Sequence, residues 1–490
     1  MTNVLGVSYG SHDAAVAVIR DGTLVYASHC ERFSRVKNDP RLDPSAVAEA
    51  LSQVDRVDSV IYYERPLLKR GRQLRAGQFS AALDPRGVRD RLREIPALRR
   101  TPVHIVGHHE SHAAGGYFTS GFDEAAVVVV DAIGEWDTVS VWSARGTSLT
   151  KVASVRYPHS IGLLYSAFTQ RVGFRPNEEE YIMMGLAAYG TPDLAELIWD
   201  DFVRSPRWPD FRLTRSVHRG VADWRPRLTN PAVIAASAQE VTERLLDDLF
   251  GWVAETVGSR NLVYSGGVAL NCRYNSRLAR STLFDRIWIM PNPGDAGSAV
   301  GAALAHLRRH VRWPGPYLGH RIAHEPDLDE AVRRLVRGEV IGFAHGRAEF
   351  GPRALGNRSL LTDPRPAAAK RRVNAVKRRE PFRPFAPAVL ADHAHEAFDL
   401  PVPHSPYMQY VARCRDPEQL MAVCHADGTS RVQTVRLAEN PVFHELLTRF
   451  HRETGCPVLL NTSLNVKGEP LVNSVEDARR FQECYGIPVL

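Results

Sequence analysis

Short apolar runs separated by polar turns predict two similar groups of β-strands in the first part of the chain. The first group consists of Asn3–Ser8, Ala14–Ile19 and Thr23–His29. About 120 residues later the same order of strand, polar turn, strand, Gly turn and strand returns. The second group consists of Ala125–Val130, Thr138–Ser143 and Leu149–Val155. This repeat predicts a duplicated α/β domain.

Helical patterns lie between and after these groups. Apolar residues spaced three or four apart predict helices over Pro44–Gln53, Ser160–Val172 and Ala235–Val257. The whole pattern resembles the actin and sugar-kinase superfold, in which two ribonuclease-H-like halves hold a nucleotide between polar turns. We therefore expect an α/β fold class with a duplicated, ribonuclease-H-like N-terminal domain.

A stretch rich in Pro, Gly and His, Trp313–Pro326, predicts a linker. The chain has 490 residues, which is too long for one hydrophobic core. We therefore expect a first domain over residues 1–315 and a second over residues 327–490.

Composition and charge narrow the function classes. The net charge is +7, and the six cysteines form no CxxC pair, which argues against a zinc ribbon or a disulfide framework. No signal peptide opens the chain and no apolar run has membrane-spanning length, so we expect a cytoplasmic protein with no membrane partner. The chain has neither a Lys/Arg tail nor an RNA-stacking motif. The basic excess therefore favours a pocket for phosphorylated small molecules over a nucleic-acid surface.

The segment His108–His112 places two imidazoles four residues apart, and therefore on one face of a helix. Asp131 ends the apolar strand that begins at Ala125, and it is a candidate third ligand. Two histidines and a carboxylate with an open position are typical of a catalytic metal site. Asp295, before an Ala-rich helix, is either a ligand or a helix cap. The alternative for the histidine pair is a His-rich surface turn.

Three other segments suggest contacts with anions or amides. Gly266 and Gly267 follow a buried strand, where paired glycines allow close approach to a nucleotide or simply form a tight turn. The loop Gly346–Ser359 mixes glycines with arginines and favours an anion cradle. Asn461 can both donate and accept hydrogen bonds and so suits an amide.

Five motifs together resemble one known family. They are His108–His112, Ser265–Asn271, Gly351–Ser359, Pro381–Pro387 and Asn461–Pro470. Over nearly its whole length the chain resembles the O-carbamoyltransferases of the NodU/CmcH type, which include TobZ-like enzymes. The resemblance implies a TsaD-like carbamoyl-transfer domain followed by a smaller α+β, YrdC-like domain.

The resemblance also implies a two-step reaction. Carbamoyl phosphate and ATP, the latter with Mg, would form carbamoyladenylate in the YrdC-like domain. In the TsaD-like domain a metal, Fe(II) or another divalent ion, would polarise the carbamoyl group while a hydroxyl of a small-molecule acceptor attacks. Antibiotic-type polyketides, macrolides and sugars are the expected acceptors. Transfer within one chain would protect the reactive anhydride from water.

Individual roles follow from the same resemblance. His108, His112 and Asp295 would bind the metal, and Asp131 would be a further ligand or orient the adenylate. His12 would act as a base or orient the acceptor, unless it only caps its turn. The remaining residues are Lys37 for carbamoyl or phosphate oxygens, Gly266, Gly267 and Asn271 for the adenylate, and Arg347, Arg353, Lys377, Arg383, Arg431 and Asn461 for carbamoyl phosphate and ATP.

Two alternative functions stay open at this point. One is a tRNA threonylcarbamoyladenosine-type modification enzyme, with which the basic charge is compatible. The other is an actin-like module that binds a nucleotide without chemistry, although such a module has no use for an open metal site. A sugar kinase is a weaker option because it would leave the histidine pair without a role.

Overall fold

The computed structural model describes residues 2–83 and 87–490, and the chain divides into two compact units. Unit 1 comprises Met1–Cys30, Pro40–Leu270 and Ser281–Pro314. Unit 2 comprises Glu31–Asp39, Asn271–Arg280 and Gly315–Leu490. The two short segments that we expected in the first domain therefore belong with the second. They contain the predicted site residues Lys37 and Asn271, which therefore belong to unit 2 and not to unit 1.

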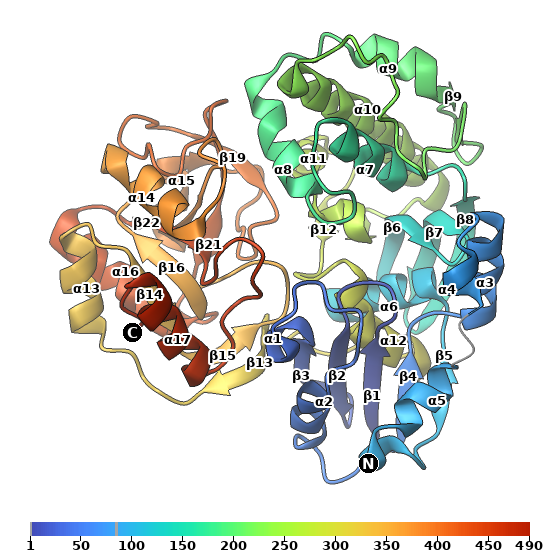
Figure 1. Ribbon diagram of the computed structural model, residues 1–490, viewed down its shortest axis with the longest axis horizontal. Helices are drawn as coiled ribbons and strands as arrows, with labels where there is room; N and C mark the ends of the chain where they lie inside the picture. Colours follow the sequence, from blue (N-terminus) through green and yellow to red (C-terminus); the bar gives the residue numbers. More distant parts are fainter. Residues whose placement is uncertain (1, 84–86) are drawn as a thin grey trace. The chain divides into compact units, whose positions relative to one another are not determined.

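Unit 1 contains two five-stranded sheets with the same strand order and directions (Figure 1). The first, in the order β3-β2-β1-β4-β5, consists of β1 (Asn3–Ser8), β2 (Ala15–Arg20), β3 (Thr23–His29), β4 (Ser59–Tyr62) and β5 (Val103–Ile105). The second, in the order β8-β7-β6-β11-β12, consists of β6 (Glu124–Gly134), β7 (Asp137–Arg145), β8 (Ser148–Arg156), β11 (Asn261–Ser265) and β12 (Arg286–Trp288). In each sheet the first three strands in sequence are antiparallel, and the last two run parallel to the first. The predicted duplicated, ribonuclease-H-like fold class is confirmed.

Strand β6 differs from its prediction in a way that affects the site. We expected it to end before Asp131, but it continues to Gly134 with a shift in its register to β7 after Val130. Such an irregularity leaves residues unpaired and redirects their side chains. Asp131 therefore lies inside an irregular strand.

The helices of unit 1 cover and separate the two sheets. They include α2 (Pro44–Leu51), α3 (Pro66–Arg75), α4 (Phe79–Ala82), α5 (Val88–Arg93), α6 (His108–Ser120), α7 (Ile161–Arg171), α8 (Glu180–Leu186), α9 (Ala195–Phe202), α10 (Pro231–Val257) and α12 (Ser298–Leu307). Helix α12 packs on β1 and β2, α6 packs on β6 and β11, and the two helices pack on each other (Figure 1). The contact is close because a Cβ at Gly301 of α12 would lie 1.9 Å from the Ser111 carbonyl oxygen of α6. This central pair brings both halves of the duplication to one place.

Unit 2 is α+β, as expected. Its main sheet has the order β14-β16-β22-β17-β21, in which only β17 and β21 pair in parallel. The strands are β13 (Tyr317–Ile322), β14 (Ile341–Ala344), β15 (Gly346–Glu349), β16 (Arg358–Thr362), β17 (Ala386–Leu390), β18 (Phe398–Asp399), β19 (Val411–Cys414), β20 (Thr429–Arg431), β21 (Gln433–Val435) and β22 (Val458–Ser463). The helices are α1 (Glu31–Ser34), α11 (Cys272–Arg280), α13 (Leu328–Val336), α14 (Ala367–Lys377), α15 (Ala394–Ala397), α16 (Pro441–Thr454) and α17 (Val475–Tyr485).

The predicted linker Trp313–Pro326 is wrong in its centre. It contains β13, which pairs with β15 and buries Leu318 and Ile322. Burial of these alternating side chains overrides the local turn signals of Pro and Gly, and the segment is part of unit 2.

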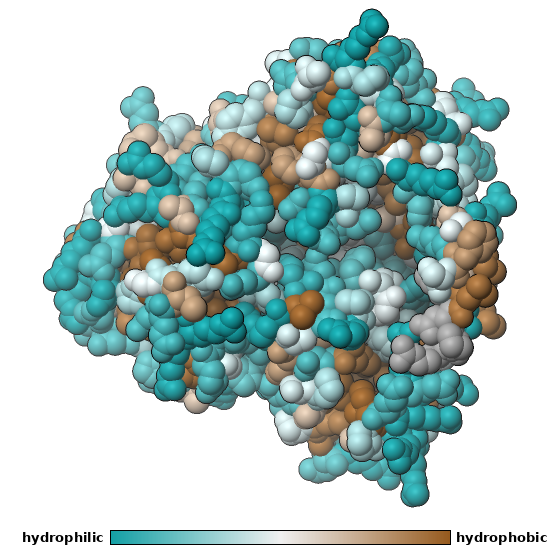
Figure 2. All heavy atoms as spheres, in the orientation of Figure 1, coloured by the Kyte–Doolittle hydropathy of each residue, from teal (hydrophilic) through white to brown (hydrophobic). Residues whose placement is uncertain are grey.

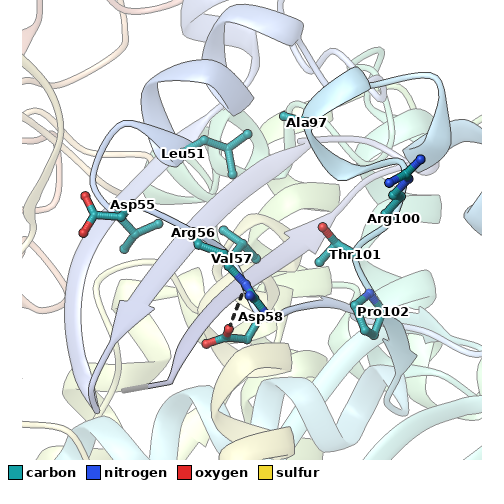
Figure 3. Close-up of a pocket in the computed structure, with 10 residues that line it drawn as sticks. Leu51, Asp55, Arg56, Val57, Asp58, Ala97, Arg100, Thr101 and Pro102 are labelled. Carbon is teal, nitrogen blue, oxygen red and sulfur yellow. Dashed lines mark ion pairs between the residues drawn. The ribbon is translucent and has the colours of Figure 1, made fainter.

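A hollow of about 440 Å³ lies beside the first sheet (Figure 3). Asp58 and Pro102 line it, and they directly precede β4 and β5. Its Arg56 pairs with Asp58 at 3.5 Å. Ligands of such sheets bind at the carboxyl ends of the parallel strands. Because this hollow lies at the amino ends, the functional site has to be sought at the opposite edge.

An apolar area lies over α3 and α4 on the surface of unit 1, and it is the brown patch at the right edge of Figure 2. Leu67, Phe79 and Leu83 are exposed there. Among the helices that the structure describes, none is long and apolar enough to cross a membrane.

Candidate metal centre and surrounding residues

Four side chains of unit 1 converge on one point. His108, His112, Asp131 and Asp295 each offer one ligand atom, and these atoms lie within 4.8 Å of one another. All four residues are buried. The structure therefore brings together every residue that we predicted as a metal ligand.

The backbone explains why these side chains meet. Helix α6 begins at His108, whose N–H donates to the Glu135 carboxylate at 3.2 Å. The spacing of four residues then places His112 on the same face. Asp131 comes from the irregular end of β6, and Asp295 from the turn that precedes α12. The packing of α6 against α12 brings these three elements to one point.

The ligand atoms are arranged as two nitrogens facing two oxygens. Asp131 Oδ2 lies 3.1 Å from His108 Nε2 and 3.4 Å from His112 Nε2. Asp295 Oδ1 lies 3.4 and 3.3 Å from the same two nitrogens. The other oxygen of Asp131 accepts the N–H of Gly267 at 3.3 Å. Two imidazoles and two carboxylates suit Fe(II), Zn(II) or Mn(II).

The charges of this cluster are complementary. Burial lowers the pKa of His108, but Asp295, Asp131 and Glu64 outweigh it and hold that pKa well above the usual value. Burial raises the pKa of Asp131, but hydrogen bonds with His108 and His112 hold it well below its usual value. A divalent cation would replace the protons on the imidazoles, because metal binding displaces protons from its ligands.

His12 lies near the cluster of His108, His112, Asp131 and Asp295 and is more exposed than these four residues. Its side chain is 45% exposed, and its Nε2 lies 3.9 Å from Asp295 Oδ2. Burial lowers the pKa of His12, but the hydrogen bond to Asp13 at 3.0 Å and the charge of Asp295 raise it to about 9. His12 can therefore hold or move a proton beside the buried ligands.

In the glycine pair Gly266–Gly267, the packing of the backbone explains why the first residue is glycine. Gly266 has a φ of +91°, and a Cβ there would lie 2.2 Å from the Val130 carbonyl oxygen. The close approach of β11 to β6 thus requires glycine, which supports the tight-turn interpretation of this residue. Asn271 lies in unit 2, where its Oδ1 accepts the N–H of Tyr274 and caps α11. The sequence did not reveal that capping role.

Unit 2 gathers several of the predicted cations. Lys377 is buried, and its Nζ donates to the Ser463 carbonyl oxygen at 2.6 Å, to Ser463 Oγ at 2.9 Å and to Asn465 Oδ1 at 2.6 Å. Burial, Arg379, Arg383 and Lys37 lower the pKa of Lys377 well below its usual value. These bonds hold the end of β22 and the loop that follows it, so a direct contact with phosphate would have to exchange one of them.

The other predicted cations are more accessible. Lys37 is 44% exposed and pairs with Glu31 at 2.7 Å. Arg383 lies 3.5 Å from Glu380. Three more predicted arginines are partly buried, namely Arg347, Arg353 and Arg431. The structure groups Lys37 and Arg383 electrostatically around Lys377.

In the loop Gly346–Ser359, Arg358 and Glu349 bind backbone groups of the protein. Arg358 is fully buried, and its guanidinium donates to several carbonyl oxygens, such as that of His345 at 2.6 Å. Glu349 Oε1 accepts the backbone N–H groups of Leu355 and Asn357 at 2.7 and 2.9 Å. The backbone N–H groups of Leu355 and Asn357 are thus bound by a carboxylate of the same loop. The sequence did not reveal this role of Glu349, because a single buried carboxylate produces no periodic pattern.

Asn461 is buried and partly committed. Its Nδ2 donates to Gln433 Oε1 at 2.8 Å and to the Ala354 carbonyl oxygen at 3.2 Å. Its Oδ1 has no hydrogen-bond partner among the residues that the structure describes. We predicted that Asn461 both donates and accepts hydrogen bonds to a ligand. Its Nδ2 already donates within the protein, so Oδ1 is the atom that can accept a further hydrogen bond.

Two residues behind the metal cluster were also missed. Glu64 Oε2 lies 3.7 Å from His108 Nδ1, and Ser298 Oγ lies 3.4 Å from His112 Nδ1. Glu64 follows a strand that is buried along its length, β4. A carboxylate after such a strand was a signal that could have identified it.

Two family models match the chain. The model described as Carbamoyltransferase N-terminus matches residues 88–304, and that described as Carbamoyltransferase C-terminus matches residues 332–490. Together they extend over both units.

Relatives match the chain over most of its length. An uncharacterized protein of Synechocystis sp. is 38% identical, with 98% of this chain and 94% of the relative covered. The nodulation protein NolNO of Sinorhizobium fredii is 34% identical, with 95% and 76% covered. The 3'-hydroxymethylcephem-O-carbamoyltransferase of Amycolatopsis lactamdurans is 31% identical, with 97% and 95% covered.

The similarity to solved structures is much weaker. Component A of the Acidaminococcus fermentans (R)-2-hydroxyglutaryl-CoA dehydratase matches with a TM-score of 0.38 and 16% identity, and the match covers 63% of this chain and 99% of that one. A similarity at this level carries no functional argument.

Proposed function

Because the chain belongs to the carbamoyltransferase family, we propose that it forms carbamoyladenylate and transfers the carbamoyl group to a hydroxyl of a small molecule. Carbamoyl phosphate, water and ATP would give carbamoyladenylate, phosphate and pyrophosphate. The acceptor oxygen would then bond to the carbamoyl carbon as AMP leaves. The observation that carries the proposal is the buried, mixed imidazole–carboxylate cluster.

We propose that unit 1 holds the transfer site. His108, His112, Asp131 and Asp295 would hold the divalent ion, which when bound supplies a Lewis acid for the carbamoyl oxygen. His12 would orient the acceptor hydroxyl, and its neutral form would take the hydroxyl proton at Nε2, the nitrogen that faces Asp295. A bound divalent ion would favour that neutral form, because it offsets the charge of Asp295 that helps to raise the pKa of His12. The Gly267 N–H, which donates to Asp131, would keep that carboxylate oriented.

We propose that unit 2 forms the adenylate. Lys37, Arg347, Arg353, Arg383 and Arg431 would bind the phosphates of carbamoyl phosphate and of ATP with its Mg, since guanidinium groups pair well with phosphate oxygens. Oδ1 of Asn461, which has no hydrogen-bond partner within the described part of the chain, would accept an N–H of the carbamoyl group.

Lys377 would act mainly by holding the loop that follows β22. Gly266, Gly267 and Asn271 stay candidate adenylate residues under this proposal.

The acceptor is proposed from the relatives. The Amycolatopsis lactamdurans relative is a 3'-hydroxymethylcephem-O-carbamoyltransferase, and its match covers 97% of this chain. We therefore propose a hydroxyl-bearing natural product, such as an antibiotic-type polyketide, macrolide or sugar. Fe(II) is the proposed ion among those that the ligand set suits.

Pyrophosphate release tests the first step. The protein is mixed with Mg-ATP, carbamoyl phosphate and Fe(II) in the absence of an acceptor, and the nucleotides and phosphates are separated. We expect slow release of pyrophosphate and AMP that depends on carbamoyl phosphate. His108→Ala should retain this release, because it changes only unit 1, whereas Arg353→Met should reduce it. Formation of ADP, or no turnover with metal bound, would refute the two-step reaction.

A further inference from the structure

Glu64 is a buried carboxylate that the proposed reaction does not use. It follows β4 and is 2% exposed. Its Oε2 lies 3.7 Å from Nδ1 of His108, the ring nitrogen opposite to the one that faces the ligand cluster. That Nδ1 is buried and has no hydrogen-bond partner among the residues that the structure describes. Glu64 is therefore placed to accept a hydrogen bond from it.

The chemistry of the ligand makes this placement meaningful. His108 presents Nε2 to Asp131 and Asp295, so Nε2 is the nitrogen available to a metal. A neutral imidazole that binds through Nε2 carries its proton on Nδ1. Metal-binding histidines almost always donate that second N–H to a carboxylate, a carbonyl or water. A contraction of less than about 1 Å would turn the 3.7 Å contact into a hydrogen bond of normal length.

The second oxygen of Glu64 is tied to the loop that carries His12. Glu64 Oε1 accepts a hydrogen bond from Nζ of Lys69. The same Nζ donates to Ser11 Oγ at 2.7 Å and to the Gly10 carbonyl oxygen at 3.2 Å. The side chain of Lys69 is only 14% exposed, so these bonds are shielded from water. Through Lys69, Glu64 is connected to the residue directly before His12.

We propose that Glu64 and Lys69 form a positioning pair. Glu64 fixes His108 as the tautomer protonated on Nδ1, and Lys69 fixes the loop that holds His12. The inference rests on the proposed function, because it assigns the metal to the ligand cluster. The second histidine, His112, has a weaker counterpart, since the partner near its Nδ1 is the neutral hydroxyl of Ser298 at 3.4 Å.

The test measures metal binding rather than turnover. Co(II) affinity of the full chain is determined by equilibrium dialysis for wild type, Glu64→Gln and Glu110→Gln. Removing a carboxylate partner of a metal-binding histidine typically weakens affinity by about 10–100-fold, and we expect that loss for Glu64→Gln. Glu110 is the matched control because it lies on α6, the helix of His108, but its carboxylate pairs with Arg308 and Arg65. Its variant should bind Co(II) as wild type does.

A measurement on the wild type does not depend on the folding of any variant. In the Zn(II)-loaded protein, ¹⁵N-correlated NMR should show the His108 proton on Nδ1, protected from exchange with water. A proton on Nε2 would overturn the inference, and so would equal Co(II) affinity in Glu64→Gln and wild type. Failure of the wild type itself to bind Co(II) would instead overturn the metal site of the proposed function.

Lys69→Met separates the two halves of the pair. We expect it to broaden the ring signals of His12 by loosening its loop, while the His108 proton on Nδ1 remains visible. Unchanged His12 signals would contradict the role of Lys69 without affecting that of Glu64. Restoration of sharp signals by Lys69→Arg would support a role based on hydrogen bonding.

Discussion

Arg358 provides a quantitative test of how the loop Gly346–Ser359 is used. Its side chain is fully buried. Nη1 donates to the carbonyl oxygens of His345 and Asn357 at 2.6 and 2.8 Å. Nη2 reaches those of His320 and Asn473, both at 3.0 Å, and Nε also contacts that of Asn473, at 3.2 Å. The guanidinium thus joins separate segments of unit 2.

Arg358→Lys keeps the charge but supplies only three N–H donors. At least two of these five contacts are lost, and hydrogen bonds to charged groups contribute about 1.5–3 kcal/mol each. We therefore expect unit 2 to lose about 3–6 kcal/mol of unfolding free energy, which is a large part of the stability of a typical domain. Arg353→Lys on the same loop is the matched control, since this side chain is only half-buried, and it should change the value by less than about 0.5 kcal/mol.

Hydrogen exchange measured by mass spectrometry across a urea series would localise the loss to the peptides of unit 2. A loss below about 1 kcal/mol would refute the reasoning from donor counts. If Arg358→Lys instead left stability unchanged and weakened carbamoyl phosphate binding, the anion-cradle interpretation would be restored for this residue.

Three further changes test other parts of the structure. Burial and the guanidinium of Arg358 lower the pKa of His345 in the folded protein to about 4. As the pH falls, this histidine therefore takes up a proton in the unfolded chain before it does so in the folded one. Unit 2 should therefore lose about 3 kcal/mol between pH 6.5 and pH 4, and His345→Gln should flatten that part of the pH–stability curve; an equal slope in urea titrations would contradict this. Asp295→Asn should weaken Co(II) binding at least tenfold in dialysis, and unaltered binding would exclude this residue as a ligand. Gly301→Ala should destabilise unit 1 by about 1–3 kcal/mol through overlap with Ser111, whereas Gly251→Ala, with nothing within 4 Å, should not; equal melting temperatures would disprove the close contact.

The sequence predicts local structure well where side-chain periodicity decides it. The strand Thr23–His29 is confirmed without change, and the histidine pair lies on a helix as its spacing requires. The helix expected over Ala235–Val257 begins earlier, at Pro231, because Asn230 caps it by accepting the N–H groups of its first turn. That start had its own signal, Asn followed by Pro, which apolar periodicity does not register.

Long-range hydrogen bonds decide what periodicity cannot. The segment Glu31–Asp39 belongs to unit 2 because Arg35 donates to the carbonyl oxygens of Pro470 and Leu471 at 3.1 and 2.7 Å. Likewise Asn275 donates to the carbonyl oxygen of Gln409 at 3.1 Å. No feature within either segment encodes a partner more than a hundred residues away.

The same limit applies to the cations of unit 2, where residue type alone does not indicate function. Arg353 and Arg358 lie five residues apart in one loop, yet the guanidinium of Arg358 donates its hydrogen bonds to backbone carbonyl oxygens. Lys377 likewise has no donor left over, because its three N–H groups have acceptors on Ser463, the last residue of β22, and on Asn465 in the loop that follows. A cation contributes to phosphate binding only with donors that the fold leaves available or can exchange. Exposure therefore ranks the half-buried Arg353 above the fully buried Arg358 as a phosphate ligand, although both arginines lie in the same loop.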